Sequence, residues 1–310
     1  ITIFIFIIYS SAWNLLAFSG QGSIGHAAFL GVGAYASTLL SLWLGLTPFI
    51  TIFLGGAFTS IVGLSIGALC VRLREWFLGM TTFAFAVIIQ MLTVDQLAWL
   101  TGGWDGLFPP GLVSAATLNY VSYRYYFILA VTLATILAIF LVIKSRIGLA
   151  MAAIRENELK ARVLGINVGS YKLLAFTLSS FFAGIAGSLQ AHHYGYVSPE
   201  IYIALNSFWP IICSVTGGLL TIEGPILGTF AVILLLEGLR GIGTFERFIF
   251  IGGILIVILV FAPRGLTYLL NAALRRITRT LEHTSRKSST STLGLDGLSL
   301  NTPRGSEDAA

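Results

Sequence analysis

The sequence predicts an all-α membrane protein, a polytopic bundle of about nine apolar helices, some of them broken or re-entrant. Two observations lead to this fold class. Of the 310 residues, 56% are hydrophobic and only 10% are charged, whereas soluble domains have about 25% charged residues. Apolar runs close to the roughly 20 residues of a bilayer crossing also recur along the chain. We therefore expect a multi-pass protein of the cell membrane.

The expected spans are separated by glycine, proline and charged residues. They cover residues 1–18, a second stretch ending near 46, then 49–71, 77–92, 125–143, 173–190, 201–220, 225–239 and 248–261. Residues 1–268 form the predicted membrane domain. Residues 269–310 form a predicted cytoplasmic tail, mostly disordered after about residue 282 because it lacks apolar periodicity. The odd span count, the outer start and Ile1 in place of Met lead us to expect that a first helix precedes this sequence.

Charges in the loops indicate which side of the membrane each loop faces. Short loops rich in Lys and Arg lie on the cytoplasmic side, and the third span is followed by Arg72 and Arg74. The next loop holds Asp95 and Asp105 but no cation before Arg124, which is typical of the outer side. The net charge of +5 thus indicates topology and contact with membrane lipid. No basic stripe is interleaved with aromatic residues, so we expect no nucleic-acid partner.

Residues 144–172, called the central segment, are the most charged interval between two spans. Six cations oppose two glutamates there: Lys144, Arg146, Arg155, Lys160, Arg162 and Lys172 against Glu156 and Glu158. Helical spacing of apolar residues predicts one amphipathic helix with a shared face: Ile147, Met151, Ile154, Ala161 and Leu164. Glu156–Lys160 and Glu158–Arg162 are expected i,i+4 pairs, and Gly148 and Gly165 mark the two ends. Such a helix can dock a soluble partner, or the loop only sets topology.

A glycine-rich stretch separates the first two spans. Gly20, Gly22 and Gly25 either let helices approach closely or break the helix and expose backbone groups to a pathway. His26 is the titratable group here, and an ionisable residue at membrane depth is a functional candidate. The alternative is a ring near the interface that hydrogen-bonds a backbone carbonyl. No Gly-Lys-Ser/Thr follows, so this is not a phosphate-binding loop.

Residues 201–220 form an irregular span. Asn206 and Pro210 interrupt it, and broken helices of this kind line cavities in transporters. The alternative is a proline kink that faces a neighbouring helix. The predicted pathway residues are Gly22, Gly25, His26, Asn206 and Pro210.

No residue pattern indicates an enzyme or a metal site. His192 and His193 are adjacent, so on a helix they point apart, and no further ligands converge in the sequence. Cys70 and Cys213 lie in apolar surroundings and are expected to be packing residues. There is no G-x-x-x-x-G-K-[ST] and no catalytic constellation. We expect no ATPase activity from the chain itself, no catalytic residues, no metal and no cofactor.

Three segments together resemble one family. They are L-A-F-S-G-Q-G-S-I-G-H-A-A-F-L-G-V-G-A-Y-A near the start, I-R-E-N-E-L-K-A-R-V-L-G-I-N-V-G-S-Y-K-L-L-A-F in the middle, and G-G-L-L-T-I-E-G-P-I-L-G-T with F-A-P-R-G-L late in the chain. The likeness, to the LivM-type permease of branched-chain amino-acid ABC importers, runs over about residues 10–268.

The resemblance implies a role and a set of partners. The chain would be the permease of an importer that moves branched-chain amino acids, or related small polar solutes, into the cytoplasm. A second homologous permease subunit, two ATP-binding subunits and an external solute-binding protein would complete it. The central segment would be the coupling element, and the residues that dock on the ATPase would be Ile154, Arg155, Glu156, Asn157, Glu158, Ala161, Gly165 and Ile166. Movement of that segment would drive alternating access.

Other functions stay open at this stage. One is a permease for urea or short amides, since no residue is a clear clamp for an amino-acid carboxylate. A second is an ATP-independent carrier, although His26 and Glu237 are nearly the only candidates for a buried charge relay. A third is a structural membrane subunit without a pathway of its own.

Overall fold

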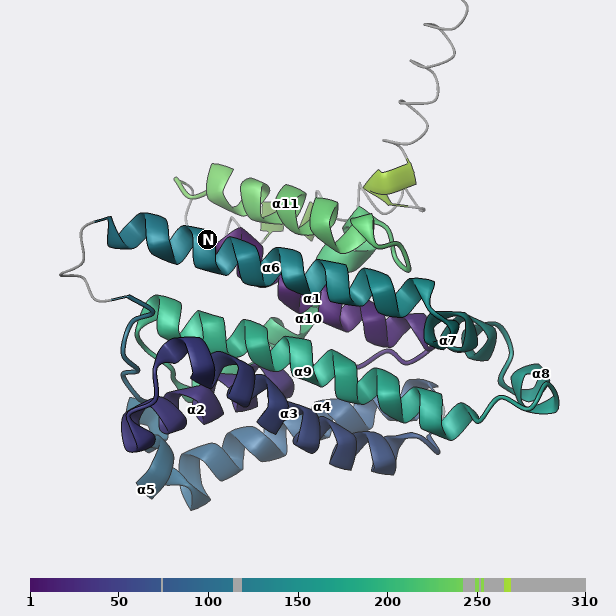
Figure 1. The fold of residues 1–310 in the computed structure, drawn as a ribbon, viewed down its shortest axis with the longest axis horizontal. Coiled ribbons are helices and arrows are strands. Elements are labelled where there is room, and N and C mark those ends of the chain that lie inside the picture. The colour runs from purple at the N-terminus through teal and green to yellow at the C-terminus, as the bar shows by residue number, and fades with distance from the viewer. Residues whose placement is uncertain (74, 114–118, 242–248, 251, 254–264, 269–310) are drawn as a thin grey trace, which may run out of the picture. The chain divides into compact units, whose positions relative to one another are not determined.

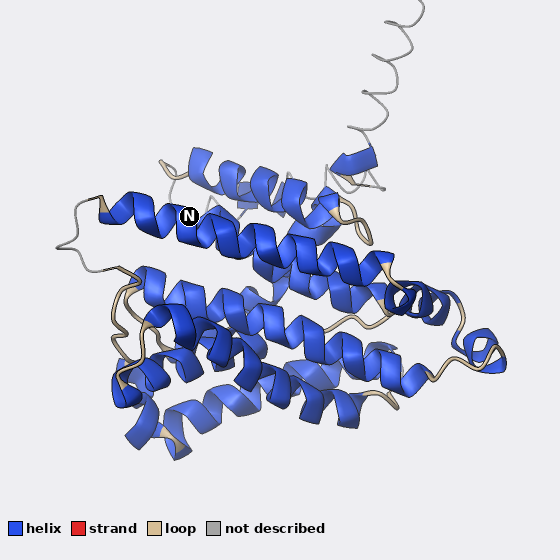
Figure 2. Cartoon of the chain, in the orientation of Figure 1, coloured by secondary structure: helices blue, strands red, loops and turns tan. Residues whose placement is uncertain are grey.

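The computed structural model describes residues 1–73, 75–113, 119–241, 249–250, 252–253 and 265–268. The chain divides into two units, Ile1–Thr267 and Tyr268–Ala310, and every labelled helix of Figure 1 lies in the first. Among the described residues there is no strand, only an isolated bridge between Leu107 and Val197 (Figure 2). The predicted all-α class is confirmed.

Eleven α-helices and three short helical turns are assigned within the described residues. They are α1 (Thr2–Phe18), α2 (Ala27–Leu44), α3 (Pro48–Cys70), α4 (Glu75–Met91), η1 (Leu92–Gln96), α5 (Ala98–Thr101), η2 (Gly103–Asp105), α6 (Tyr120–Lys144), α7 (Arg146–Glu156), α8 (Glu158–Val163), α9 (Val168–Tyr194), η3 (Pro199–Tyr202), α10 (Ala204–Gly217) and α11 (Glu223–Gly238).

Within the part of the chain that the structure describes, five helical stretches are long and apolar enough to cross a bilayer. They are Ala27–Leu44, Pro48–Cys70, Trp76–Gln96, Tyr120–Lys144 and Val168–Tyr194. Helix α1 is apolar but shorter. Most of the predicted last span, residues 248–261, and the predicted tail lie outside the described residues.

Helix α9 is the centre of the first unit and packs on α3 through small residues. On α3 a small residue recurs every four positions, at Gly55, Thr59, Gly63 and Gly67. These four positions face Ser188, Gly184, Ser180 and Phe176 of α9 in antiparallel order. Without bulky side chains the two backbones approach closely, which is how helices gain packing energy in lipid. Helices α2 and α9 also pack through glycines. A Cβ on Gly33 of α2 would overlap the backbone of α9, and a Cβ on Gly187 of α9 would overlap the backbone of α2.

The irregular span 201–220 is a turn followed by a short helix. Its α-helical part, α10, has 14 residues, about 21 Å at 1.5 Å per residue, which is too short to cross a bilayer of about 30 Å. The breaks lie at Ile203 before α10 and at Gly218 (φ 133°) after it. Pro210 lies inside α10 and is buried, so it does not end the helix. Cys70 and Cys213 are free and fully buried, as expected for packing residues.

Candidate functional site

The central segment folds as two helices, so the prediction of one amphipathic helix is wrong. Asn157 has an extended backbone (φ −164°, ψ 108°) and separates α7 from α8. Its side-chain Oδ1 accepts a hydrogen bond from the backbone N–H of Lys160 at 3.0 Å, which caps the start of α8. Gly148 does not mark an end, because α7 begins at Arg146 with Ser145 as its cap and Gly148 packs on the carbonyl of Ile143.

The predicted end at Gly165 is confirmed. Gly165 has φ +80°, a conformation that favours glycine. Its N–H donates to the carbonyl of Arg162, and the N–H of Ile166 donates to the carbonyl of Ala161, both at 3.0 Å. This pair of bonds is a Schellman motif, which satisfies carbonyls that the helix end would leave free.

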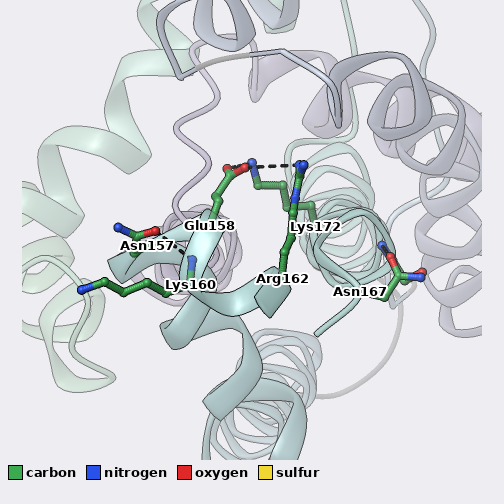
Figure 3. Close-up of polar contacts among 7 residues, drawn as sticks. Asn157, Glu158, Lys160, Arg162, Asn167 and Lys172 are labelled. Carbon is green, nitrogen blue, oxygen red and sulfur yellow. Dashed lines mark hydrogen bonds and ion pairs between the residues drawn. The ribbon is translucent and has the colours of Figure 1, made fainter. Parts of the chain in front are cut away.

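Glu158 connects α8 to the start of α9 (Figure 3). Its carboxylate forms an ion pair with Lys172, whose side chain is only 7% exposed, and a longer one with Arg162 at 3.9 Å. The predicted Glu158–Arg162 pair is thus confirmed. The predicted Glu156–Lys160 pair is wrong, because the break at Asn157 removes the helical spacing, and Glu156 pairs with Arg155 at 3.3 Å instead.

The two helices bury one face and expose another. Ile154, Ala161 and Val168 form a small apolar cluster, with Ile166 packed against it, and Met151 joins the main core. Leu164 was expected on this face but is 77% exposed, because α8 starts a new rotation after Asn157. The exposed apolar side chains of α8 and its end are Leu159, Val163 and Leu164, at 73%, 88% and 77%. Helices α7 and α8 lie together at one end of the bundle (Figure 1).

Arg155 joins the central segment to the end of α1. Its guanidinium lies 5.7 Å from the ring centroid of Phe18, within the range of a cation–π contact. Gly20 (φ +78°) lies so close that an added Cβ would sit 3.3 Å from the Cα of Arg155. One guanidinium nitrogen of Arg155, Nη1, is buried without a hydrogen-bond partner among the described residues. Gly20 and Arg155 line a polar pocket of about 650 Å³ that also includes Arg72 and Arg162.

The glycine-rich connection, residues 19–26, leads from this contact into the bundle. It is not part of either helix: α1 ends at Phe18 and α2 begins at Ala27. Of the two alternatives for these glycines, the structure thus shows a break in the helix. Gly25 packs on the backbone carbonyl of Thr82 in α4, with no room for a Cβ. The N–H of Ile24 donates to the Thr82 hydroxyl at 3.2 Å. Gly22 is exposed and faces open space.

His26 lies in the interior of the bundle, and the alternative of a ring that bonds a backbone carbonyl near the interface is wrong. Its side chain is fully buried between Tyr9, stacked at 5.4 Å, and Phe29, edge-on at 5.5 Å. Neither ring nitrogen has a hydrogen-bond partner among the described residues. The same holds for the buried Gln21 Nε2 and Ser23 Oγ nearby. A buried polar group without a hydrogen-bond partner costs free energy, so His26 stays a candidate functional residue.

Tyr9 brings part of the predicted pathway together. Its hydroxyl donates to the backbone carbonyl of Asn206 at 2.9 Å, while its ring stacks on His26. Asn206 also lines a pocket of about 410 Å³ that includes Glu200. Pro210 lies one turn further along α10 and has no hydrogen bond to this group among the described residues. The sequence analysis missed Tyr9, and the signal available was a phenol within an apolar span that also carries Ser10 and Asn14.

His192 and His193 have different partners, as their adjacent positions on a helix predicted. His192 Nδ1 donates to the carbonyl of Pro110 at 2.8 Å, and its Nε2 lies 2.9 Å from the Ser37 hydroxyl. His193 Nδ1 lies 2.6 Å from a guanidinium nitrogen of Arg124. No group of three or more His, Cys, Asp or Glu that could hold a metal occurs in the part of the chain that the structure describes.

Comparison with known proteins identifies the family. The family described as "Branched-chain amino acid transport system / permease component" matches residues 1–260. The chain belongs to this family. The permease family accounts for the helical membrane bundle and for a multi-pass protein of the cell membrane, and it is a family of transport proteins rather than enzymes.

Individual relatives of this permease agree. The high-affinity branched-chain amino acid transport system permease protein LivM of Escherichia coli K12 is 28% identical over 84% of this chain and 67% of its own length. BraD, a permease protein of the same description from Pseudomonas aeruginosa, is 29% identical over 47% of this chain and 48% of its own. The probable branched-chain amino acid permease LivH of Methanocaldococcus jannaschii is 24% identical over 73% and 76%. No solved structure gives a significant match.

Proposed function

We propose that this permease is the membrane subunit of an ATP-binding-cassette importer that carries branched-chain amino acids into the cytoplasm. It works with a second homologous permease subunit, two ATP-binding subunits and an external solute-binding protein. The observation that carries the proposal is the two-helix projection α7–α8, which lies at one end of the bundle (Figure 1) and exposes an apolar face.

The residues of the projection divide by their surroundings. The exposed Leu159, Val163 and Leu164 contact the ATPase, because apolar side chains at a domain end gain most from a partner surface. Glu156 and Arg162, both largely exposed, lie at its edge. The buried Ile154 and Ala161 and the partly buried Ile166 keep the shape of the projection. Asn157 and Gly165 set the ends of α8, and Glu158 pairs with Lys172 of α9.

The solute pathway follows the glycine-rich connection. Arg155 contacts Gly20, so displacement of α7 by the ATPases moves the connection that carries Gly22, Gly25 and His26. Tyr9 links His26 to Asn206 at the start of α10, and Pro210 continues that helix. Two arrangements of this connection open the site alternately to the two sides, which is alternating access around a broken helix.

The test is Val163→Asp in the assembled transporter. Val163 is 88% exposed, so the variant is expected to insert and fold normally. A carboxylate buried against the ATPase without a partner costs several kcal/mol, so we expect loss of the ATP-binding subunits on mild-detergent purification and at least about tenfold slower leucine uptake. Val163→Ile is the matched control and keeps both.

Three outcomes would contradict the proposal. Normal uptake by Val163→Asp would show that the exposed face does not dock a partner. Recovery of the wild-type chain without ATP-binding subunits would favour an ATP-independent carrier. Uptake of urea but not of leucine by the intact transporter would contradict the proposed substrate.

A further inference from the structure

The polar pocket of about 650 Å³ lies between segments that are far apart in the sequence. Gly20 lines it from the connection after α1, and Arg72 and Trp76 line it from the end of α3 and the start of α4. Arg155 and Glu158 line it from the α7–α8 projection. Its volume is within the range of about 300–1,000 Å³ that is typical of small-ligand sites. None of the predicted pathway residues lines it, so the solute pathway does not account for this pocket.

The described charged side chains at the pocket carry an excess of positive charge. The lining includes three arginines and two glutamates: Arg72, Arg155, Arg162, Glu156 and Glu158. Glu158 also pairs with Lys172 of α9 (Figure 3). Four cations therefore oppose two carboxylates, a net charge of 4 − 2 = +2. Every group keeps its charge within its ion pair, so pairing does not remove this excess.

Two of the arginines have N–H groups without an acceptor among the described residues. Arg72 is exposed and is in no ion pair there. Arg155 donates from Nη2 to Glu156 at 3.3 Å, whereas its Nη1 is buried without a partner. A buried charged donor without an acceptor costs free energy. Phosphate oxygens are the acceptors that a guanidinium binds best, because several N–H groups bond one anion at once.

An apolar stripe on α4 leads away from the pocket. Trp76, Met80 and Phe83 lie four and three residues apart, so they share one face of the helix. They are 81%, 66% and 37% exposed. The stretch Trp76–Gln96 is long and apolar enough to cross a bilayer, and Trp is enriched where the membrane meets water. The pocket therefore lies at the depth of lipid headgroups, with the stripe at the depth of the acyl chains.

We infer that this pocket binds the phosphate group of an anionic membrane phospholipid. Arg72 and Arg155 bond the phosphate, and the acyl chains lie along Met80 and Phe83. A soluble phosphate ester offers the same oxygen atoms, but the apolar stripe beside the pocket suits only a lipid. Basic pockets between helices on the cytoplasmic side, where the charges of this chain place the pocket, take such headgroups. The inference concerns a lipid and does not depend on which solute is carried.

The test measures lipid preference at Trp76 in the complete transporter, reconstituted in phosphatidylcholine nanodiscs. A minor part of the lipid is brominated phosphatidylglycerol or brominated phosphatidylcholine, and bromine quenches a nearby tryptophan. The signal of Trp76 is the fluorescence that Trp76→Phe removes. We expect the wild type to prefer phosphatidylglycerol at least about fivefold, and Arg72→Gln to lower that preference about fivefold. Arg72→Lys keeps the charge, so it should keep at least about half of the preference and stay monodisperse.

Arg146→Gln is the matched control, because Arg146 is an exposed cation of the same central segment that does not line the pocket. It should keep the full preference, and an equal loss there would mean that only general surface charge attracts the lipid. Equal quenching by the two lipids in the wild type would overturn the inference. Weak quenching by both would also overturn it, because another subunit would then cover the pocket. Loss of the preference on addition of glycerol phosphate would overturn the choice of a lipid in favour of a soluble phosphate ester.

Discussion

Helices α9 and α6 have similar lengths, 27 and 25 residues, yet opposite surroundings. In α9, 67% of the most apolar stretch is buried, against 28% in α6. The buried helix is the one rich in Ser and Gly, whereas the exposed one is lined by Leu, Ile and Phe. In lipid, apolar surface gains little from being covered, so close backbone packing and hydrogen bonds determine which helix lies inside.

The strongest way to break this comparison is Gly187→Val in α9. A Cβ at Gly187 would overlap the backbone carbonyl of Leu30 in α2, and backbone cannot move aside as a flexible side chain can. We expect a loss of about 3 kcal/mol or more, seen as a collapse of monodisperse protein in detergent size-exclusion chromatography. Gly238→Val is the control, because nothing lies within 4 Å of a Cβ there. Equal yields from the two variants would contradict the packing argument.

A smaller effect is expected from Ser188→Ala. The Ser188 hydroxyl lies 2.9 Å from the carbonyl of Gly33 across the α2–α9 contact and 2.8 Å from the carbonyl of Gly184 in its own helix, so the two carbonyls share its single proton. Hydrogen bonds between membrane helices average about 0.6 kcal/mol, so thermal unfolding should shift downward by only a few degrees. A change as large as that of Gly187→Val would mean that polar bonding, not close approach, dominates this contact.

The smallest effect is expected from Leu137→Ala in α6. Leu137 is 57% exposed, and truncation of an exposed side chain stays within about 0.5 kcal/mol. Stability of the isolated chain should therefore not change measurably. Co-purification of the second permease sharpens the comparison: if the variant loses that subunit while its own stability is intact, α6 faces a protein partner rather than lipid.

The sequence predicted the structure best where the conformation depends on neighbouring residues in the chain. The positions of most spans, the start of α3 at Pro48 and the turn at Gly165 follow from composition and from glycine and proline geometry.

The sequence could not predict the features that depend on contacts between residues far apart in the chain. Helical spacing from Ile147 to Leu164 fits one helix as well as two, so only the capping role of Asn157 could have indicated the break. The bridge between Leu107 and Val197 joins residues 90 positions apart, so the sequence around either residue does not predict it. The environment of His26 depends on Tyr9, which lies on another helix.

The polar face of α1 has a consequence for how the chain is made. Asn14 donates to the carbonyl of Thr221 and accepts from the N–H of Leu220, and the first bond joins positions 207 residues apart. At about 5–20 residues per second, the ribosome needs about 10–40 s to synthesise that interval. During this time the Asn14 amide lacks these two partners, although the rest of α1 can already pack on α6 and α9. The Asn14 end of α1 therefore takes its final contacts only after residues 220–221 have been made.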